Sequence, residues 1–179
     1  MATTPVHPPA LPRRRLLRHG AALVAGGGLG ALLTGCGFAL RSEPVLPFSK
    51  IALLGFTEAS PLGAELRQRL GSQVQVLTAP AGAQVLLRVQ EDRRQKVVAA
   101  STAAGQVREL TLRVRFSFRA ETPAGRTLIP DSELMLERDM SYSETSALAK
   151  EQEEAELYAA MQTDIVLQVL RRLSRVQIG

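Results

Sequence analysis

The chain has 179 residues, a formal net charge of +5 at pH 7, one cysteine, two histidines and only 4% aromatic residues. Its excess positive charge lies at the start, since no acidic residue precedes Glu43, and from Cys36 onward 18 basic and 17 acidic residues nearly cancel. A nucleic-acid partner is therefore excluded, because the folded part lacks both a basic excess and the aromatic side chains that stack on bases.

Residues 1–35 have the organisation of a secretory signal peptide. A basic segment ends at Arg18, and an apolar stretch of 13 residues follows at 21–33. This stretch is shorter than the roughly 20 apolar residues of a membrane-spanning helix, and its four glycines disfavour a stable helix. The alternatives are a transmembrane anchor or a buried core helix.

The arginine-rich run "RRRLLR" leaves the export route open. It loosely resembles a twin-arginine motif, although Pro12 stands where serine or threonine is usual. We favour the general secretory route, with twin-arginine export as the alternative.

The single cysteine, Cys36, ends the sequence "LTGC" that closes the apolar stretch. An aliphatic residue, two small residues and a cysteine in this order resemble a bacterial lipobox. In such a motif the thiol accepts a diacylglyceryl group, and cleavage frees the cysteine amine for acylation. We therefore expect a covalent diacylglyceryl and N-acyl lipid on Cys36, no other cofactor, and durable anchoring by several acyl chains. Gly37, in place of the aspartate typical of inner-membrane retention, favours the outer membrane.

After a lipidated N-terminus and extended tether at 36–49, the pattern predicts a strand, a helix and a second strand. The apolar run 50–56 predicts a buried strand, and 73–78 alternates as a second one. Between them, Ser60 suits the N-cap of a helix that begins at Pro61, and Gly71 suits its C′ position. A strand–helix–strand unit therefore opens the domain.

Two hairpins are predicted next. The segment 84–90 predicts a third strand that could continue through Ala100, and Gly105 marks a turn. The segment 109–120 alternates apolar and polar residues, which is typical of a strand with one buried and one wet face. After a turn at 122–125, the return strand covers 126–142 with an interruption near Pro130.

The last element predicted is a helix from Ser143 to about Ser174. Its apolar residues recur every three or four positions: Tyr158, Met161, Ile165, Val169 and Leu173. At 1.5 Å per residue it would be roughly 45 Å long, so we expect its first turns to project past the sheet. The predicted fold is α+β: a mixed sheet of four or more strands with a short and a long helix on one face. The domain covers 50–175, and 176–179 form a tail.

The mature chain lacks the residues of common catalytic and metal sites. Both histidines, His7 and His19, lie in the predicted signal peptide, and the only thiol is predicted to be acylated. This removes Ser-His-Asp and Cys-His catalysis and the usual zinc and copper sites. We therefore predict a protein that is not an enzyme and holds no metal.

Four features together resemble one family. The start "CGFALR", the strand–helix–strand opening, the hairpin tip "AAGQ" and the final "ALAKEQEEAELYAAMQTDIVLQVLRRL" are similar to the LptE family of lipopolysaccharide-assembly lipoproteins. The resemblance covers residues 33–175. It implies a non-enzymatic outer-membrane lipoprotein that plugs the β-barrel LptD, assists its assembly and takes part in delivering lipopolysaccharide to the outer leaflet. The protein would be lipid-anchored, inside the barrel lumen, and would face the periplasm.

The resemblance also implies residues that bind lipopolysaccharide. The lysine of "ALAK" is Lys150, for which an ion pair with Glu154 is the alternative role. The family's arginine before the tip glycine is Ala103 here, and its histidine in the start motif is Ala39, so Arg108 becomes a second candidate. A polar face that carries three arginines would suit a polar barrel lumen, or would be an ordinary solvated face: Arg113, Arg115 and Arg119.

A generic lipid-binding or carrier lipoprotein of the outer membrane remains the alternative function. It would need a large apolar hollow in the domain.

Overall fold

The computed structural model describes residues 44–178. Its elements in chain order are β1 (Lys50–Leu54), α2 (Pro61–Gly71), β2 (Gln75–Leu77), β3 (Val85–Ser101), β4 (Val107–Glu121), β5 (Thr127–Ser141), the 3-10 turn η2 (Glu144–Ser146) and α3 (Ala147–Leu173). The predicted signal peptide, Cys36 and Ala39 lie outside the described residues.

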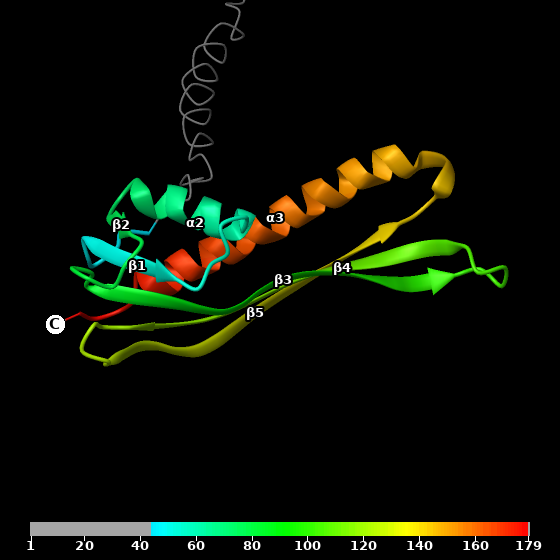
Figure 1. Cartoon of the computed structure of the whole chain (residues 1–179). Helices are drawn as coiled ribbons and strands as arrows, with labels where there is room; N and C mark the ends of the chain where they lie inside the picture. Colours follow the sequence, from blue (N-terminus) through cyan, green and yellow to red (C-terminus); the bar gives the residue numbers. More distant parts are fainter. Residues whose placement is uncertain (1–43, 179) are drawn as a thin grey trace, which may run out of the picture. The chain divides into compact units, whose positions relative to one another are not determined.

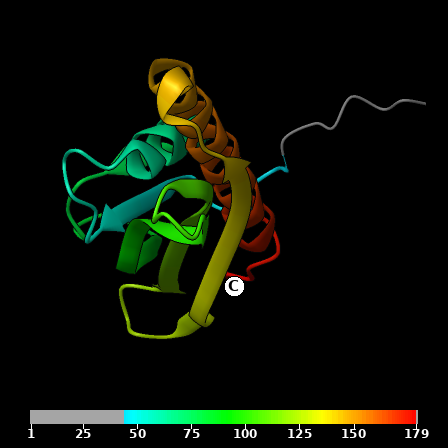
Figure 2. The same ribbon diagram turned by 90° about the vertical axis from the view of Figure 1, so that its right-hand side faces the viewer.

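The strands form one five-stranded sheet in the order β2-β1-β3-β4-β5. The short strand β2 and the first residues of β3 both run parallel to β1, with α2 as the crossover between β1 and β2. The long strands β3, β4 and β5 form two antiparallel hairpins. Both helices lie on the same side of the sheet (Figures 1 and 2). The predicted α+β class, with a mixed sheet and two helices on one face, is confirmed.

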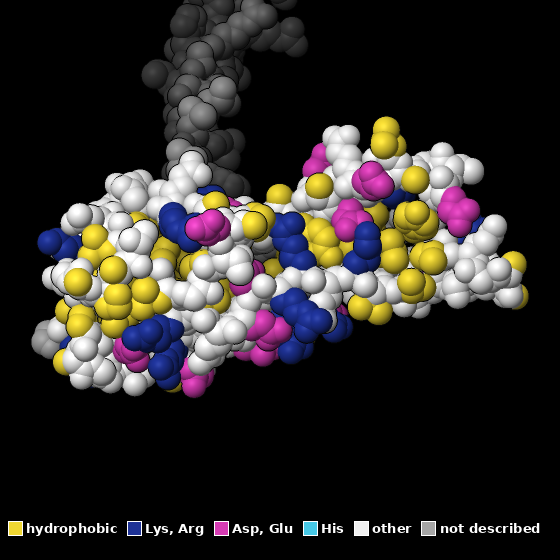
Figure 3. All heavy atoms as spheres, viewed as in Figure 1, with side chains coloured by type: hydrophobic (Ala, Val, Ile, Leu, Met, Phe, Trp, Pro, Cys, Tyr) yellow, Lys and Arg dark blue, Asp and Glu magenta, His cyan; other side chains and the backbone are white. Residues whose placement is uncertain are grey.

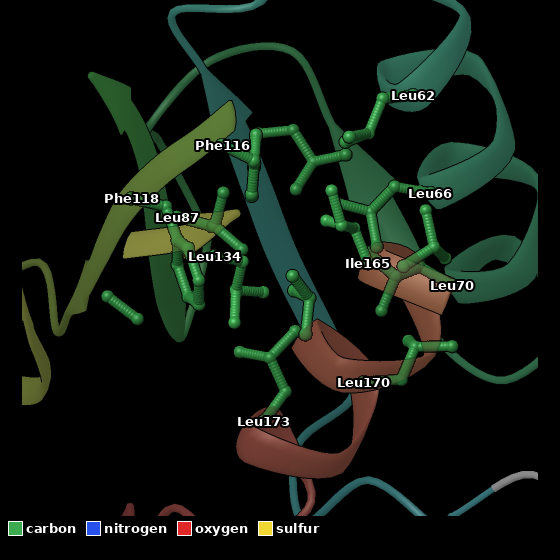
Figure 4. Close-up of a cluster of buried hydrophobic side chains, with 14 of the residues drawn as sticks. Leu62, Leu66, Leu70, Leu87, Phe116, Phe118, Leu134, Ile165, Leu170 and Leu173 are labelled. Atoms are coloured by element: carbon green, nitrogen blue, oxygen red, sulfur yellow. The ribbon is translucent and has the colours of Figure 1, made fainter. Parts of the chain in front are cut away.

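The core fills the space between the sheet and the helices. The alternation predicted for β4 holds, because its apolar residues from Leu110 to Ala120 are all buried. They face Leu62, Leu66 and Leu70 of α2 and the predicted stripe of α3 (Figure 4). That stripe is fully internal: Tyr158, Met161, Ile165, Val169 and Leu173.

The start of α2 follows the sequence signals, whereas its end does not. The Ser60 hydroxyl accepts a hydrogen bond from the Gly63 amide at 2.8 Å, as the N-cap prediction requires. The C′ prediction for Gly71 is wrong, since Gly71 is the last helical residue and Ser72 is the C-cap. A left-handed glycine is unnecessary there, because the Leu70 carbonyl accepts from the amides of Gln73 and Val74.

Pro130 does not break the return strand. β5 is continuous, and the proline is absorbed by a register shift between the pairs Phe118–Ser132 and Ala120–Ile129. This works because β5 is the last strand of the sheet, so a residue without an N–H is tolerated on its open side.

The packed body extends beyond both predicted boundaries. Leu46 and Phe48, expected in the tether, are buried against the core, so packing begins before Lys50. At the other end, Val176 is buried and the Ile178 carbonyl accepts a hydrogen bond from Arg126 at 2.8 Å. Both short segments therefore belong to the fold.

The first half of α3 diverges from the sheet but does not project past it as predicted, because the β3–β4 hairpin extends beyond the start of the helix (Figure 1). None of residues 147–157 is buried, and Tyr158 is the first buried residue of the helix. Figure 1 shows this half rising away from the sheet toward the end that carries the β3–β4 turn. Within the described residues, no helix has the length and apolar character needed to cross a membrane.

Candidate functional site

The two candidate lipopolysaccharide-binding residues lie on neighbouring elements at one end of the sheet. Lys150, on the first turn of α3, donates to the Ser141 hydroxyl at 3.0 Å, at the end of β5. Arg108, near the start of β4, accepts at its carbonyl from the Tyr142 amide at 2.8 Å. Ser141 and Tyr142 are adjacent in sequence, so the structure brings both cations to the same end of the fold.

Lys150 is held in place by its own helix. Its ammonium contacts Glu153 at 2.7 Å, and its side chain is only 19% exposed. The alternative role as a partner of Glu154 is wrong, because the carboxylate of Glu154 pairs with Lys96 at 2.8 Å. An ammonium has three donors, and two are used here, which leaves one for a further anionic ligand.

Arg108 is exposed, and in the described part of the chain its guanidinium has no ion pair or hydrogen bond. It lines a depression of about 280 Å³ together with Gln106, Val107, Ser143, Glu144 and Thr145. The guanidinium has five donors in a planar fork that suits phosphate oxygens, whereas the hydroxyls of Ser143 and Thr145 hydrogen-bond each other at 2.8 Å and leave one O–H between them. These donors could contact an anionic ligand, while the carboxylate of Glu144 in the same depression opposes one.

The β3–β4 turn carries no cation at the position where the family has an arginine. Ala103 is exposed in a tight turn that Gly105 closes with a φ of 80°. The Thr102 amide donates to the Gln106 carbonyl at 2.8 Å and fixes the turn. The tip offers only small side chains next to the cation end of β4.

The three arginines of the outer sheet face share that face with carboxylates. Arg113 contacts Glu137 at 2.5 Å, while Arg115 and Arg119 lie 3.8 and 3.7 Å from Glu133 and Glu121. Glu121 also binds Arg88 at 2.6 Å, and this hydrogen bond lowers the pKa of its carboxyl below the ordinary value. The face is therefore a polar surface of mixed charge.

The sequence did not single out a polar row on the helix-covered face of β3. Asp92 accepts a hydrogen bond from the Ser60 hydroxyl, and Arg94 donates to the Gln162 amide oxygen. Lys96 pairs with Glu154, and their hydrogen bond raises the pKa of the lysine. The signal was present, since these three charges alternate along "EDRRQK".

Tyr158 connects this row to α3. The Arg94 guanidinium lies 5.1 Å from the centre of the Tyr158 ring, and the Tyr158 hydroxyl donates to the Gln95 carbonyl at 2.7 Å. Burial raises the pKa of that hydroxyl, so it stays a neutral donor. The row fixes α3 on the sheet through hydrogen bonds and an ion pair.

Grouped ligands for a metal ion are absent among residues 44–178, where no three acidic, histidine or cysteine side chains converge. What this part of the chain offers is ion pairs, exposed cations and polar surface. Such groups bind anions and proteins.

A family model described as "LptE: Lipopolysaccharide-assembly" matches residues 48–173. None of the curated proteins compared with the chain matches it.

Three solved structures are similar to this chain. A lipoprotein B from Nitrosomonas europaea is 28% identical, with a TM-score of 0.63, and the match covers 77% of this chain and 90% of that one. A minor lipoprotein from Acinetobacter baumannii is 23% identical, with a TM-score of 0.56 and coverages of 72% and 92%. The rare lipoprotein B from Shewanella oneidensis is 23% identical, with a TM-score of 0.54 and coverages of 70% and 90%. The last two likenesses concern the fold alone.

Proposed function

Because this chain belongs to the LptE family of lipopolysaccharide-assembly proteins, we propose that it plugs and assists assembly of the outer-membrane barrel LptD. In this role it takes part in delivering lipopolysaccharide to the outer leaflet. The lipid on Cys36 anchors it to the outer membrane, and the domain lies within the barrel lumen with access to the periplasm. The observation that carries the proposal is the family match, which spans nearly the whole folded body.

The surface of the domain supports a place inside a barrel. Lumens of membrane barrels are polar, and a protein inside one must present polar groups to the wall. The outer face of β4 and β5 does so through the ion pairs of Arg113, Arg115 and Arg119. The proposal assigns this mixed-charge face to the barrel wall.

The interior favours the plug over a lipid carrier. Leu66, Phe116 and Ile165 are fully buried and occupy the space between sheet and helices where a carrier would hold a ligand. Figure 4 shows these layers facing one another across the core. No observation on the described residues favours the carrier function.

The proposal is tested by isolating the full-length protein from outer membranes and identifying what copurifies by mass spectrometry. We expect the LptD barrel in near-equal amounts. The matched control for the lipid is Cys36→Ser, which cannot accept a thioether-linked lipid and should incorporate no labelled fatty acid, whereas the wild-type protein should. Wild-type protein that is monomeric in detergent and free of any barrel would sink the proposal.

Lys150 provides a narrower prediction. We expect Lys150→Asp to lower lipopolysaccharide binding by about tenfold, because the change reverses one charge in a site with few cations. Recovery of the barrel should be unaffected. The measurement is binding of labelled lipopolysaccharide to the purified complex.

Lys50→Asp, an equal charge reversal at the exposed start of β1, serves as the control and should leave binding unchanged. Equal binding by both variants would assign Lys150 to a structural role through Glu153.

A further inference from the structure

More than half of β3 has no neighbouring strand on one side. β1 pairs with β3 only from Val85 to Arg88, so within residues 44–178 no strand borders its remainder, 89–101, on that side. In an antiparallel pair, every second residue directs its N–H and C=O away from the partner strand. Such an edge is a template for another strand unless it is protected.

The open edge of β3 divides into a protected and an unprotected part. Five charged residues in its first part disfavour pairing with another strand: Glu91, Asp92, Arg93, Arg94 and Lys96. The next five residues, 97–101, carry no charge. Val97 and Val98 are 49% and 53% exposed there, which places two of the large exposed apolar side chains side by side in sequence. Charged residues and prolines, the usual protection of an edge, are missing from this part.

The first half of α3, residues 147–157, lies beside the same edge. A groove of about 480 Å³ lies between them, lined by Arg94 and Lys96 of β3 and by Glu151, Glu154, Ala155 and Tyr158 of α3. We call it the β3 groove. Val98 pairs with Leu110 of the buried face, so its side chain lies on the side of the sheet that carries α3. Figure 3 shows apolar side chains gathered between α3 and the sheet in this half, with basic ones among them.

We propose that an extended segment of the assembly partner pairs with β3 at 97–101 and adds a sixth strand to the sheet. Another extended backbone can pair with a whole row of such N–H and C=O groups at once. Alternate side chains of the added strand enter the β3 groove, where they meet the Ala155 methyl group and the Tyr158 ring. This inference rests on the proposed function in taking the barrel protein as the source of the segment.

Charge indicates what the segment carries on the side that faces α3. Within the described residues the carboxylate of Glu151 has no ion pair or hydrogen bond, whereas Glu154 is already engaged by Lys96. A basic side chain on the added strand would complement Glu151. The remaining positions would be uncharged, to match 97–101.

The same charges disfavour a second copy of this chain as the occupant. Two copies paired edge to edge about a two-fold axis would place both α3 helices on one side of the joined sheet. Their acidic first halves would then face each other: Glu151, Glu153, Glu154 and Glu156. Like charges at close range oppose such a dimer.

Amide hydrogen exchange tests the pairing directly. The full lipidated chain is prepared from outer membranes with whatever partner it retains, and separately after overproduction without a partner. We expect peptides that cover 97–101 to exchange at least tenfold more slowly in the membrane-derived sample. β1, which is paired with a strand on each side, is the internal reference and should exchange equally in both samples.

Substitutions add a second measurement. Val98→Lys places a charge on the edge and should reduce recovery of the partner about tenfold, while Val45→Lys, at an 85% exposed valine away from the sheet, should not. Val97→Lys repeats the test from the opposite face of the strand. Thermal unfolding of each variant separates a lost contact from a lost fold, and the wild-type exchange result stands whatever the variants do.

The outcomes distinguish this inference from the proposed function. If the barrel copurifies but exchange at 97–101 is unchanged, the edge pairing is wrong and the plug function stands. Slow exchange that grows with the concentration of partner-free protein would identify a second copy as the occupant and overturn the inference. If no barrel copurifies, the plug function fails, and the edge pairing stands only if 97–101 is protected by another protein strand.

Discussion

Replacing Phe116 with alanine should lower the free energy of unfolding by about 3–5 kcal/mol. The ring is fully buried on β4, and it stacks on Phe56 at 5.9 Å and on Phe118 at 5.4 Å between ring centres. It thereby joins the segment after β1 to the long hairpins. Truncation would leave a cavity in the core that the surrounding side chains can fill only in part. The unfilled volume is the reason for the large loss of stability.

The measurement is urea unfolding of the chain from Gly37 onward, monitored by circular dichroism. Ser117→Ala is the control, because it changes the next residue on the opposite face and should stay within about 0.5 kcal/mol of wild type. A domain of this size has a total stability of about 5–15 kcal/mol, so Phe116→Ala should consume a large part of it. A loss below 1 kcal/mol would show that the ring does not join the segment after β1 to the long hairpins.

Substituting Gly55 should be nearly as damaging, for a backbone reason. Gly55 has a φ of 90°, and a Cβ atom there would lie 2.6 Å from the Val89 carbonyl oxygen. That oxygen belongs to β3, which cannot move away without disturbing the ladder. We expect Gly55→Ala to cost about 3 kcal/mol or more, from the strained φ together with the collision.

Gly82→Ala separates these two causes. Gly82 has a similar φ of 79°, but open space surrounds its missing side chain. Its substitution should cost only about 1 kcal/mol, which is the conformational part alone. Both variants are compared with wild type by thermal unfolding, and equal shifts in Tm would mean that the close approach to Val89 has no energetic weight.

The fold was predictable wherever one periodicity dominated. The strict alternation of β4 and the stripe of α3 each place a complete row of apolar residues on one face, so one element implied the orientation of the next. β3 was harder, because its middle, 91–96, carries charges on both faces and its outer part is supported by hairpin pairing with β4. The end of α2 was missed because the carbonyl of Leu70 finds its donors without the left-handed residue that a glycine suggests.

The ion-pair partners of the candidate residues were not predictable from the sequence. Lys150 has acidic residues three and four positions ahead, and sequence spacing cannot decide between them. The tertiary contact of Lys96 with Glu154 settles it, leaving Glu153 for Lys150. The sequence of β4 alone predicts a basic outer face. Carboxylates of β5 balance its arginines, and their positions opposite the arginines are set by the pairing register of the two strands.

The contact between α2 and α3 has a consequence for how the chain reaches its destination. Thr163 of α3 donates to the carboxylate of Glu65 on α2 at 3.0 Å across 98 residues of sequence, and Leu66 and Leu70 are buried in the same core cluster as Ile165. The apolar side of the first helix therefore has no cover until nearly the last residues have been synthesised. Contacts of such long range make folding slow. We therefore expect the domain to close only after the segment that forms α3 is available, a late step that would be compatible with export of an unfolded chain.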